Sequence, residues 1–211
     1  EFPKAGAYFG GIAGYLTETG NAVTECGNTG TVTGAGDYLG GIVGGTGGGT
    51  GIVIDGCYNS STGTVTNAGK TQTGGILGGS ISGNAIVRNS YNQGKVAGGT
   101  GGTSVGGIAG GVTTGTQVTG CYNAGTVTGA SSEGTVKSIA GSNSGSGNVT
   151  YSYYLSGSSY PSGSYPVDDN ATGVEEAAFG TWGAAFALNG KKLGQAAGSI
   201  SWTYQLSLIH I

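Results

Sequence analysis

The stretch that decides the fold is residues 106–128, GGIAGGVTTGTQVTGCYNAGTVT, because each of its three parts recurs along the chain in the same order. The first part, Gly-Gly-Ile-x-Gly, recurs at 10–14, 40–44, 74–78 and 106–110, with a worn copy at 137–141. Successive copies therefore start at nearly even intervals along the chain. A fixed period of about 20–50 residues is the signature of a repeat architecture, in which each repeat is one supersecondary unit.

The two other parts recur in the same phase. A cysteine or serine returns once in every copy, as Cys26, Cys57, Ser90, Cys121 and Ser152. A β-branched residue stands three positions earlier in every copy, as Val23, Ile54, Val87, Val118 and Val149. A Gly-x-Val-Thr or Gly-x-Val-Ala run ends four copies, at 30–33, 63–66, 94–97 and 125–128. Composition alone does not keep five units in register.

Each unit offers three short runs rich in Val, Ile, Thr and Tyr between glycines and asparagines, which is typical of strands. One unit cannot bury its own apolar face, but units stacked at about 4.8 Å per rung can. We therefore predict an all-β fold, a β-solenoid of about five repeats of about 31 residues each. A row of antiparallel hairpins, such as a β-prism or a partial propeller, is the alternative. The predicted core columns are Ile12, Ile42, Ile76, Ile108 and Ile139, then Val23, Ile54, Val87, Val118 and Val149, then Cys26, Cys57 and Cys121.

The composition excludes several classes of protein. Glycine supplies 50 of the 211 residues and charged residues only 8%, while three prolines and no triplet period exclude collagen. The net charge of −3 without a basic stripe argues against a nucleic-acid partner. No apolar run reaches the roughly 18 residues of a membrane span. We expect the Gly-Gly pairs and lone glycines at corners between strands, where tight turns need a positive φ.

The repeat pattern decays after Ser152. Thr172 stands three residues before Glu175, as in a capping box, and apolar residues follow at spacings of four, which predicts a short amphipathic helix over residues 173–188. Such a helix would cap the last apolar rung of the solenoid. The chain then divides into repeats at 1–155, a loop and helix cap at 156–205, and residues 206–211, which resemble a translated sequencing adapter and are excluded from functional reasoning.

The cysteine column is interpreted as a buried small residue, because cysteine and serine alternate there. Stacked rungs would place Cys26 and Cys57 about 5 Å apart, which permits a disulfide by distance. The only histidine, His210, lies in the excluded tail, so no cysteine has a catalytic base. No cysteine pair stands at the spacing of zinc ligands. The sequence thus predicts no catalytic residue, no cofactor and no metal.

The carboxylates of the repeats, Glu18, Glu25, Asp37, Asp55 and Glu133, share no repeat position. Glycoside hydrolysis needs two carboxyl groups about 5–10 Å apart, and the sequence brings no two of them together. The adjacent pair at 168–169 is interpreted as a solvated turn rather than a calcium site.

The tyrosine column, Tyr58, Tyr91, Tyr122 and Tyr153, is the candidate ligand surface. Strand alternation places it on the face opposite the cysteines, where an outward aromatic ladder could stack on sugars. The asparagines that follow, Asn28, Asn59, Asn92 and Asn123, return to the inner face and are interpreted as a structural ladder between rungs. Recurrent Thr-x-Thr steps at 31–33, 64–66 and 126–128 leave ice or another crystal surface as a further ligand, although Lys95 and Ala97 interrupt that array.

The Gly-Gly-Ile-(Ala/Val/Leu)-Gly block followed by Cys-Tyr-Asn-x-Gly-x-Val-Thr-Gly resembles the GLUG-motif repeat family of bacterial surface and secreted proteins, over about residues 5–155. The resemblance implies an extracellular, adhesin-like repeat segment of a larger protein, with further domains expected beyond both ends, and it brings no catalytic residues. We therefore expect a non-enzymatic stalk or adhesion module, with glycans or surface proteins as partners. The alternative is a carbohydrate-active β-helix, a glycoside hydrolase or polysaccharide lyase, with catalytic carboxylates in loops.

Overall fold

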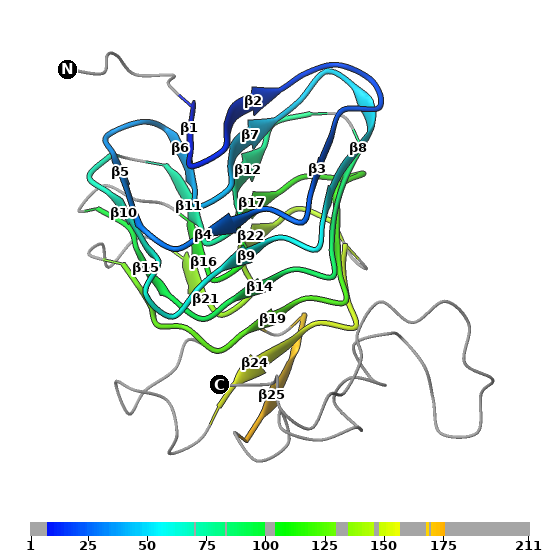
Figure 1. The fold of residues 1–211 in the computed structure, drawn as a ribbon. Coiled ribbons are helices and arrows are strands. Elements are labelled where there is room, and N and C mark those ends of the chain that lie inside the picture. Colours follow the sequence, from blue (N-terminus) through cyan, green and yellow to red (C-terminus); the bar gives the residue numbers. More distant parts are fainter. Residues whose placement is uncertain are drawn as a thin grey trace, which may run out of the picture.

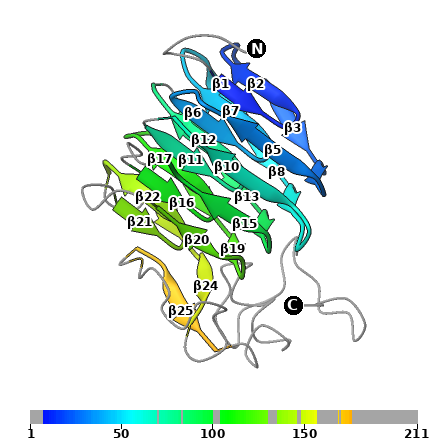
Figure 2. The same ribbon diagram turned by 90° about the vertical axis from the view of Figure 1, so that its left-hand side faces the viewer.

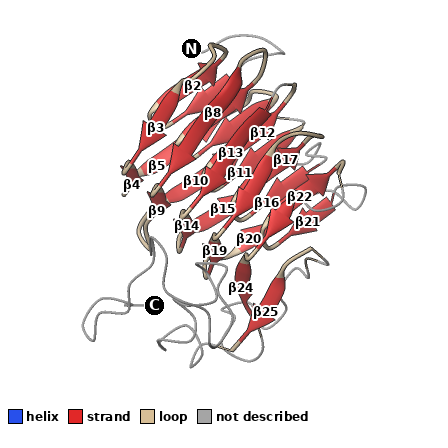
Figure 3. Cartoon of the chain, turned by 90° about the vertical axis from the view of Figure 1, so that its right-hand side faces the viewer, coloured by secondary structure: helices blue, strands red, loops and turns tan. Residues whose placement is uncertain are grey.

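The computed structural model describes residues 8–69, 71–82, 84–99, 104–129, 135–145, 148–156, 168 and 170–175. These residues form short strands joined by turns, and none of them lies in a helix (Figures 1 and 3). Every strand pairs in parallel with its equivalents one repeat earlier or later, as in Tyr8 with Tyr38 and Thr64 with Thr31. The predicted β-solenoid is confirmed, and one repeat of the sequence corresponds to one rung of the solenoid.

Each full rung contains five strands, where the sequence indicated three. The first rung comprises β1 (Tyr8–Gly10), β2 (Ala13–Leu16), β3 (Ala22–Thr24), β4 (Gly27–Asn28) and β5 (Thr31–Gly34). The second comprises β6 (Tyr38–Gly40), β7 (Val43–Thr46), β8 (Thr50–Asp55), β9 (Tyr58–Asn59) and β10 (Thr64–Asn67). The third comprises β11 (Gln72–Gly74), β12 (Leu77–Ser80), β13 (Asn84–Arg88), β14 (Tyr91–Asn92) and β15 (Lys95–Ala97).

The fourth rung comprises β16 (Ser104–Gly106), β17 (Ala109–Val112), β18 (Gln117–Thr119), β19 (Tyr122–Asn123) and β20 (Val127–Thr128). The fifth comprises β21 (Thr135–Lys137), β22 (Ala140–Asn143), β23 (Val149–Thr150) and β24 (Tyr153–Leu155), and β25 (Thr172–Val174) begins a sixth layer. The equivalent strands of successive rungs form five parallel sheets, named here the first to the fifth sheet in the order in which a rung visits them (Figure 2).

The first and second sheets meet along a column of glycines, the glycine seam, formed by Gly44, Gly78, Gly110 and Gly141. A Cβ atom on Gly44 would lie 2.6 Å from the backbone nitrogen of Phe9, and one on Gly78 would lie 2.7 Å from that of Leu39. Such contacts are too short for any side chain, so the two sheets approach backbone to backbone. The seam glycines are therefore required for close approach.

The expectation that the paired glycines lie at positive φ is wrong. Among the described glycines a positive φ occurs only at Gly20, Gly48, Gly51, Gly56, Gly115 and Gly120. None of these belongs to the Gly-Gly-Ile-x-Gly blocks. The blocks carry glycine because neighbouring backbone fills the space of a Cβ atom; at Gly40, for example, that atom would meet the carbonyl oxygen of Val43.

The core consists of apolar columns that run along the solenoid. The isoleucine column is fully buried at Ile42, Ile76, Ile108 and Ile139, and it packs with the Ile54–Val87–Val118 column and with Cys57 and Cys121. A second cluster, Val96, Val105 and Val127 with Val136, lies between the fifth and first sheets. Ile12 is an exception to the predicted core, because it lies in the first rung and its side chain is 55% exposed.

A column of left-handed residues turns the chain from the third sheet to the fourth. Glu25, Gly56, Asn89, Gly120 and Tyr151 hold equivalent positions, and their φ angles lie between 47° and 64°. Three of the five are not glycine, and the left-handed region costs an L-residue about 1–2 kcal/mol. The repeat thus enforces a corner geometry even where the local residue disfavours it.

We expect Gly56→Ala to destabilise the protein by about 1 kcal/mol, because φ at Gly56 is +64° while the nearest atoms leave ordinary room for a methyl group. Chemical denaturation followed by circular dichroism would measure this difference. The converse variant, Glu25→Gly, should be neutral or slightly stabilising, since it relieves the same strain. Equal losses in both variants would contradict this explanation.

The predicted helix does not begin where the capping box placed it. Thr172–Val174 form β25, which pairs in parallel with β24 through Tyr153 and Thr172, so the chain starts a further layer of the fourth sheet. The rest of the predicted helix, residues 176–188, lies outside the described residues, as do residues 206–211 with His210. The neighbouring strand explains the difference: an edge that offers parallel pairing competes with a marginal local helix signal.

Candidate functional site

The tyrosine column is an aromatic ladder on the fourth sheet. The ring centroids of Tyr58 and Tyr91 lie 5.3 Å apart at 11°, and those of Tyr91 and Tyr122 lie 5.1 Å apart at 3°. Tyr122 is buried, while Tyr58, Tyr91 and Tyr153 are half-buried. Because the rings stack on one another, the faces between successive rings are occupied and the ladder exposes mainly ring edges. Sugar stacking requires a free aromatic face, which this arrangement does not offer between rungs.

The first rung carries Gly27 in this column in place of a tyrosine. A Cβ atom on Gly27 would lie 2.1 Å from the ring of Tyr58, so glycine gives that ring its space. Burial raises the pKa of the Tyr91, Tyr122 and Tyr153 hydroxyls, with the neighbouring tyrosines as smaller causes. These three hydroxyls therefore remain neutral well into the alkaline range.

The asparagine column forms an internal hydrogen-bonded ladder, as predicted. Asn28 Nδ2 donates to Asn59 Oδ1 at 2.8 Å, Asn59 donates to Asn92 at 2.7 Å, and Asn92 donates to Asn123 at 2.6 Å. Asn59, Asn92 and Asn123 are at most 1% exposed. Asn92 Nδ2 also donates to the carbonyl oxygen of Gly94, which ties the ladder to the following turn. Each amide is thus hydrogen-bonded to its neighbours and is not presented to a ligand.

The cysteine column is buried at Cys57 and Cys121 and half-buried at Cys26, and all three thiols are free. The pairing of Cys26 with Cys57 that distance permits is not formed. Serine takes the same role where it replaces cysteine: Ser90 Oγ accepts the backbone N–H of Cys57 at 3.1 Å and donates to the carbonyl of Arg88. The position therefore needs a small group that can bond the backbone of adjacent rungs.

We expect stability to fall as pH rises above about 9. Burial raises the pKa of the Cys121 thiol to about 12, whereas an unfolded thiol titrates near 8.5. The folded state then holds a proton that the unfolded state has lost, so the contribution is fully present below about pH 8.5 and disappears towards pH 12. Denaturant midpoints at pH 8 and pH 10.5 measure the loss. Cys121→Ser should weaken that pH dependence, because serine does not titrate there; an unchanged dependence would contradict the assignment.

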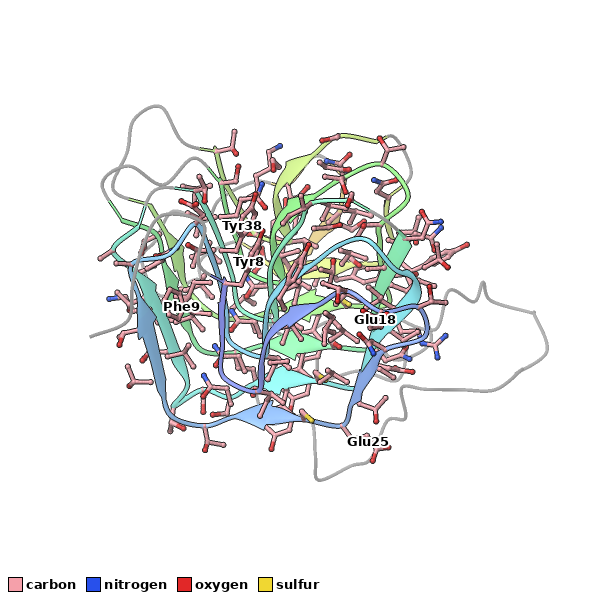
Figure 4. The ribbon with its side chains drawn as sticks, turned by 90° about the horizontal axis from the view of Figure 1, so that it is seen from above. Tyr8, Phe9, Glu18, Glu25 and Tyr38 are labelled. Carbon is pink, nitrogen blue, oxygen red and sulfur yellow. The ribbon has the colours of Figure 1, made fainter. Side chains whose placement is uncertain are left out.

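Among the described carboxylates of the repeats, Asp55 is held by two neighbouring side chains. Asp55 accepts from Arg88 Nε at 2.8 Å and from Asn89 Nδ2 at 2.7 Å, so it is engaged at the corner between the third and fourth sheets. Glu18 and Glu25 lie exposed and apart at the rim of the first rung (Figure 4). Glu133 lies outside the described residues. Within the described part of the chain no three His, Cys, Asp or Glu side chains gather as they would around a metal ion.

Asp168 is the titratable residue whose environment the sequence analysis misjudged. Its side chain is 1% exposed, not solvated. Oδ2 accepts the backbone N–H groups of Ile139 at 3.2 Å and Ala140 at 2.8 Å. A sequence signal for this role exists: Asp168 follows Ile139 by 29 residues, close to one repeat period.

The threonine side chains of the fifth sheet face outward. Thr64 Oγ1 donates to Thr31 Oγ1 at 2.9 Å, and Lys95 follows these two threonines in the same column. Thr33, Thr66 and Thr128 are exposed in the neighbouring column, which Ala97 interrupts. Separately, the first and second sheets carry a second aromatic cluster, in which the Tyr8 ring lies 4.2 Å from that of Tyr15 and 4.9 Å from that of Tyr38 (Figure 4).

Comparison of the chain with protein-family models, with curated proteins and with solved structures gives no match. Among the described residues, no helix is long and apolar enough to cross a membrane. The site therefore has to be interpreted from its own geometry. That geometry defines a class, a parallel β-solenoid with polar and aromatic ladders along its axis.

Proposed function

We propose that the chain is a non-enzymatic structural segment, a stalk, of a larger bacterial surface or secreted protein. The observation that carries the proposal is that side chains of successive rungs bond and stack with one another. The asparagine amides bond from rung to rung at 2.6–2.8 Å and the tyrosine rings stack along the same direction. Side chains that contact one another along the solenoid axis stiffen the rod, and a spacer has to be stiff. The resemblance to GLUG-motif surface proteins supports the same reading.

Force spectroscopy on the whole chain, tethered at its ends, tests the stalk. A rung of about 31 residues releases about 10 nm of contour length when it unfolds. We expect force peaks separated by multiples of that length, because each rung contacts only its neighbours. Smooth extension without force peaks would show a flexible linker and would overturn the proposal.

Adhesion is the second function that the tyrosine surface could support, through the ring edges and the connecting loops. A glycan array probed with the whole chain, beside a Tyr91→Ala variant, separates the two functions. The stalk proposal predicts no saccharide binding that depends on Tyr91, because its ring is stacked against both Tyr58 and Tyr122. Binding that the variant loses would assign the chain to recognition instead. Release of reducing ends from a polysaccharide panel would assign it to the carbohydrate-active enzymes.

A further inference from the structure

Some asparagines of the chain stand in the tripeptide Asn-x-Ser/Thr, which is the acceptor signal for N-linked oligosaccharides when its middle residue is not proline. They are Asn59 with Ser61, Asn148 with Thr150, and Asn170 with Thr172. The signal is short and arises often by chance, so the sequence does not choose among these sites. The structure separates them, because a glycan on the side-chain nitrogen requires that nitrogen to face solvent.

Two of the acceptors are closed by the fold. Asn59 is fully buried, and its Nδ2 donates to Asn92 Oδ1 at 2.7 Å within the asparagine ladder. Asn148 is 9% exposed, and its Nδ2 donates to the carbonyl oxygen of Thr113 at 2.9 Å. An oligosaccharide on either nitrogen would have to pass through packed side chains and backbone, so neither site is compatible with the folded solenoid.

Asn170 differs from both, because it is exposed in the tight turn that leads into β25. Its Nδ2 lies 3.4 Å from Asp168 Oδ1, which is longer than an ordinary N–H···O bond of about 2.7–3.2 Å. Backbone donors hold the turn instead: the Asn170 N–H donates to Asp168 Oδ1 at 3.0 Å, and the Ala171 N–H donates to the Asp168 carbonyl oxygen at 3.1 Å. The side-chain nitrogen of Asn170 is therefore not needed to hold the fold.

The hydroxyl residue of the signal is exposed as well. Thr172 is the first residue of β25, and its backbone N–H donates to the carbonyl oxygen of Ser152 at 3.1 Å. Asp168, two residues before Asn170, adds a carboxylate that neither of the other two acceptors has at that place. In the chain before folding, this carboxylate is available to pair with a cationic group of a transferase.

We infer that Asn170 is an N-glycosylation site, an inference that rests on the proposed surface or secreted location. The donor is an oligosaccharide linked to a polyprenyl diphosphate. A bond forms between Asn170 Nδ2 and the anomeric carbon of the first sugar, and the bond from that carbon to the diphosphate oxygen breaks. The amide nitrogen loses one proton, the polyprenyl diphosphate leaves, and no oxidant or reductant takes part. The folded chain then carries the glycan in solvent beside the β25 turn.

The test exports the whole chain, behind a cleavable leader, from a bacterial host that carries an oligosaccharyltransferase and its polyprenyl-diphosphate-linked oligosaccharide, both shown to be active on a reference glycoprotein. Mass spectrometry of the folded, purified chain and of its peptides gives the occupancy of each asparagine. We expect about half of the chains or more to carry a glycan at Asn170, and fewer than about a twentieth to carry one at Asn59 or Asn148.

Variants of the signal separate a specific transfer from an accidental one. Asn170→Gln and Thr172→Val should each lower the occupancy at least about tenfold, whereas Thr172→Ser should retain it, because the signal requires the hydroxyl. All of these changes are at exposed positions, so the fold should survive them. Asn84→Gln is the matched control, since Asn84 is also exposed but has Ile86 where the signal needs a hydroxyl, and it should leave the occupancy unchanged.

A copy of residues 168–172 appended to the end of the chain presents the same acceptor outside the fold. A modified copy beside an unmodified Asn170 would overturn the inference, because the folded chain would then exclude the glycan. Two unmodified sites would overturn it as well, since the tripeptide would not be an acceptor at all. Either result would leave the force peaks expected of a stalk unaffected, so a failure here is distinguishable from a failure of the proposed function.

Discussion

Gly78→Ala is expected to destabilise the solenoid by at least about 4 kcal/mol, enough to unfold a domain of ordinary stability in large part. The added Cβ atom would lie within 2.3 Å of the carbonyl oxygen of Gly44 and 2.7 Å from the backbone nitrogen of Leu39. Both are backbone atoms, on the preceding rung and on the facing sheet. The Gly44 oxygen can move only if β7 separates from β12, and the Leu39 nitrogen only if the first sheet separates from the second. The cost therefore exceeds that of ordinary overpacking, about 1–3 kcal/mol.

Gly30→Ala is the matched control for this prediction, because no atom lies within 4 Å of the Cβ position there and its φ is not in the left-handed region. It should stay within about 0.5 kcal/mol of the wild type. Urea denaturation followed by far-ultraviolet circular dichroism measures both variants. If Gly78→Ala proved as stable as Gly30→Ala, the glycine seam would have no role in closing the rung.

Asn92→Ala is expected to cost about 3–5 kcal/mol. The substitution leaves the Asn59 Nδ2 group without its acceptor, and it removes one of the two donors of Asn123 Oδ1, which keeps the backbone N–H of Gly125 at 3.2 Å. Asn59 and Asn123 are at most 1% exposed. Each buried polar group left unpaired costs about 1–3 kcal/mol, and the cavity adds to this. The loss should appear as a lower denaturant midpoint without a change in the far-ultraviolet spectrum of the folded state.

Asn28→Ala removes the same side chain from the exposed end of the ladder and serves as the control. Asn28 gives one amide bond to Asn59 and lies in the half-buried first rung, so the loss should be about 1 kcal/mol. A ladder whose members contribute equally along its length would give the same loss in both variants. That result would show that burial does not set the strength of these bonds.

The parallel stack, its period and most of its core could be predicted because they depend only on identical residues recurring in phase. Ile42, Ile76 and Ile108 had to lie one above another in any solenoid with this spacing. Ile12 shares their sequence context yet is exposed, since burial depends on a covering rung and not on the residue itself. The asparagine ladder could be predicted on the same grounds, because one column of identical amides bonds along the stack.

The number of strands in each rung and the role of the glycines could not be predicted in the same way. The sequence indicated three strands in each unit, but the Gly-Gly-Ile-x-Gly block spans the junction of two sheets and so divides into the ends of two strands. Whether a glycine supplies positive φ or close approach depends on atoms from other rungs, such as the backbone nitrogen of Gly78 beside Gly40. The local sequence contains no record of those neighbours.

The sequence by itself determined that this protein is a stack of parallel rungs, each one repeat long. The repeats keep the same spacing even where single residues differ between them. Only the tertiary structure decided how each rung closes and that Asp168 is buried. Closure depends on backbone contacts across the glycine seam, which have no side-chain signature. The burial of Asp168 depends on the backbone N–H groups of Ile139 and Ala140, which its carboxylate accepts and which lie 29 and 28 residues earlier in the chain.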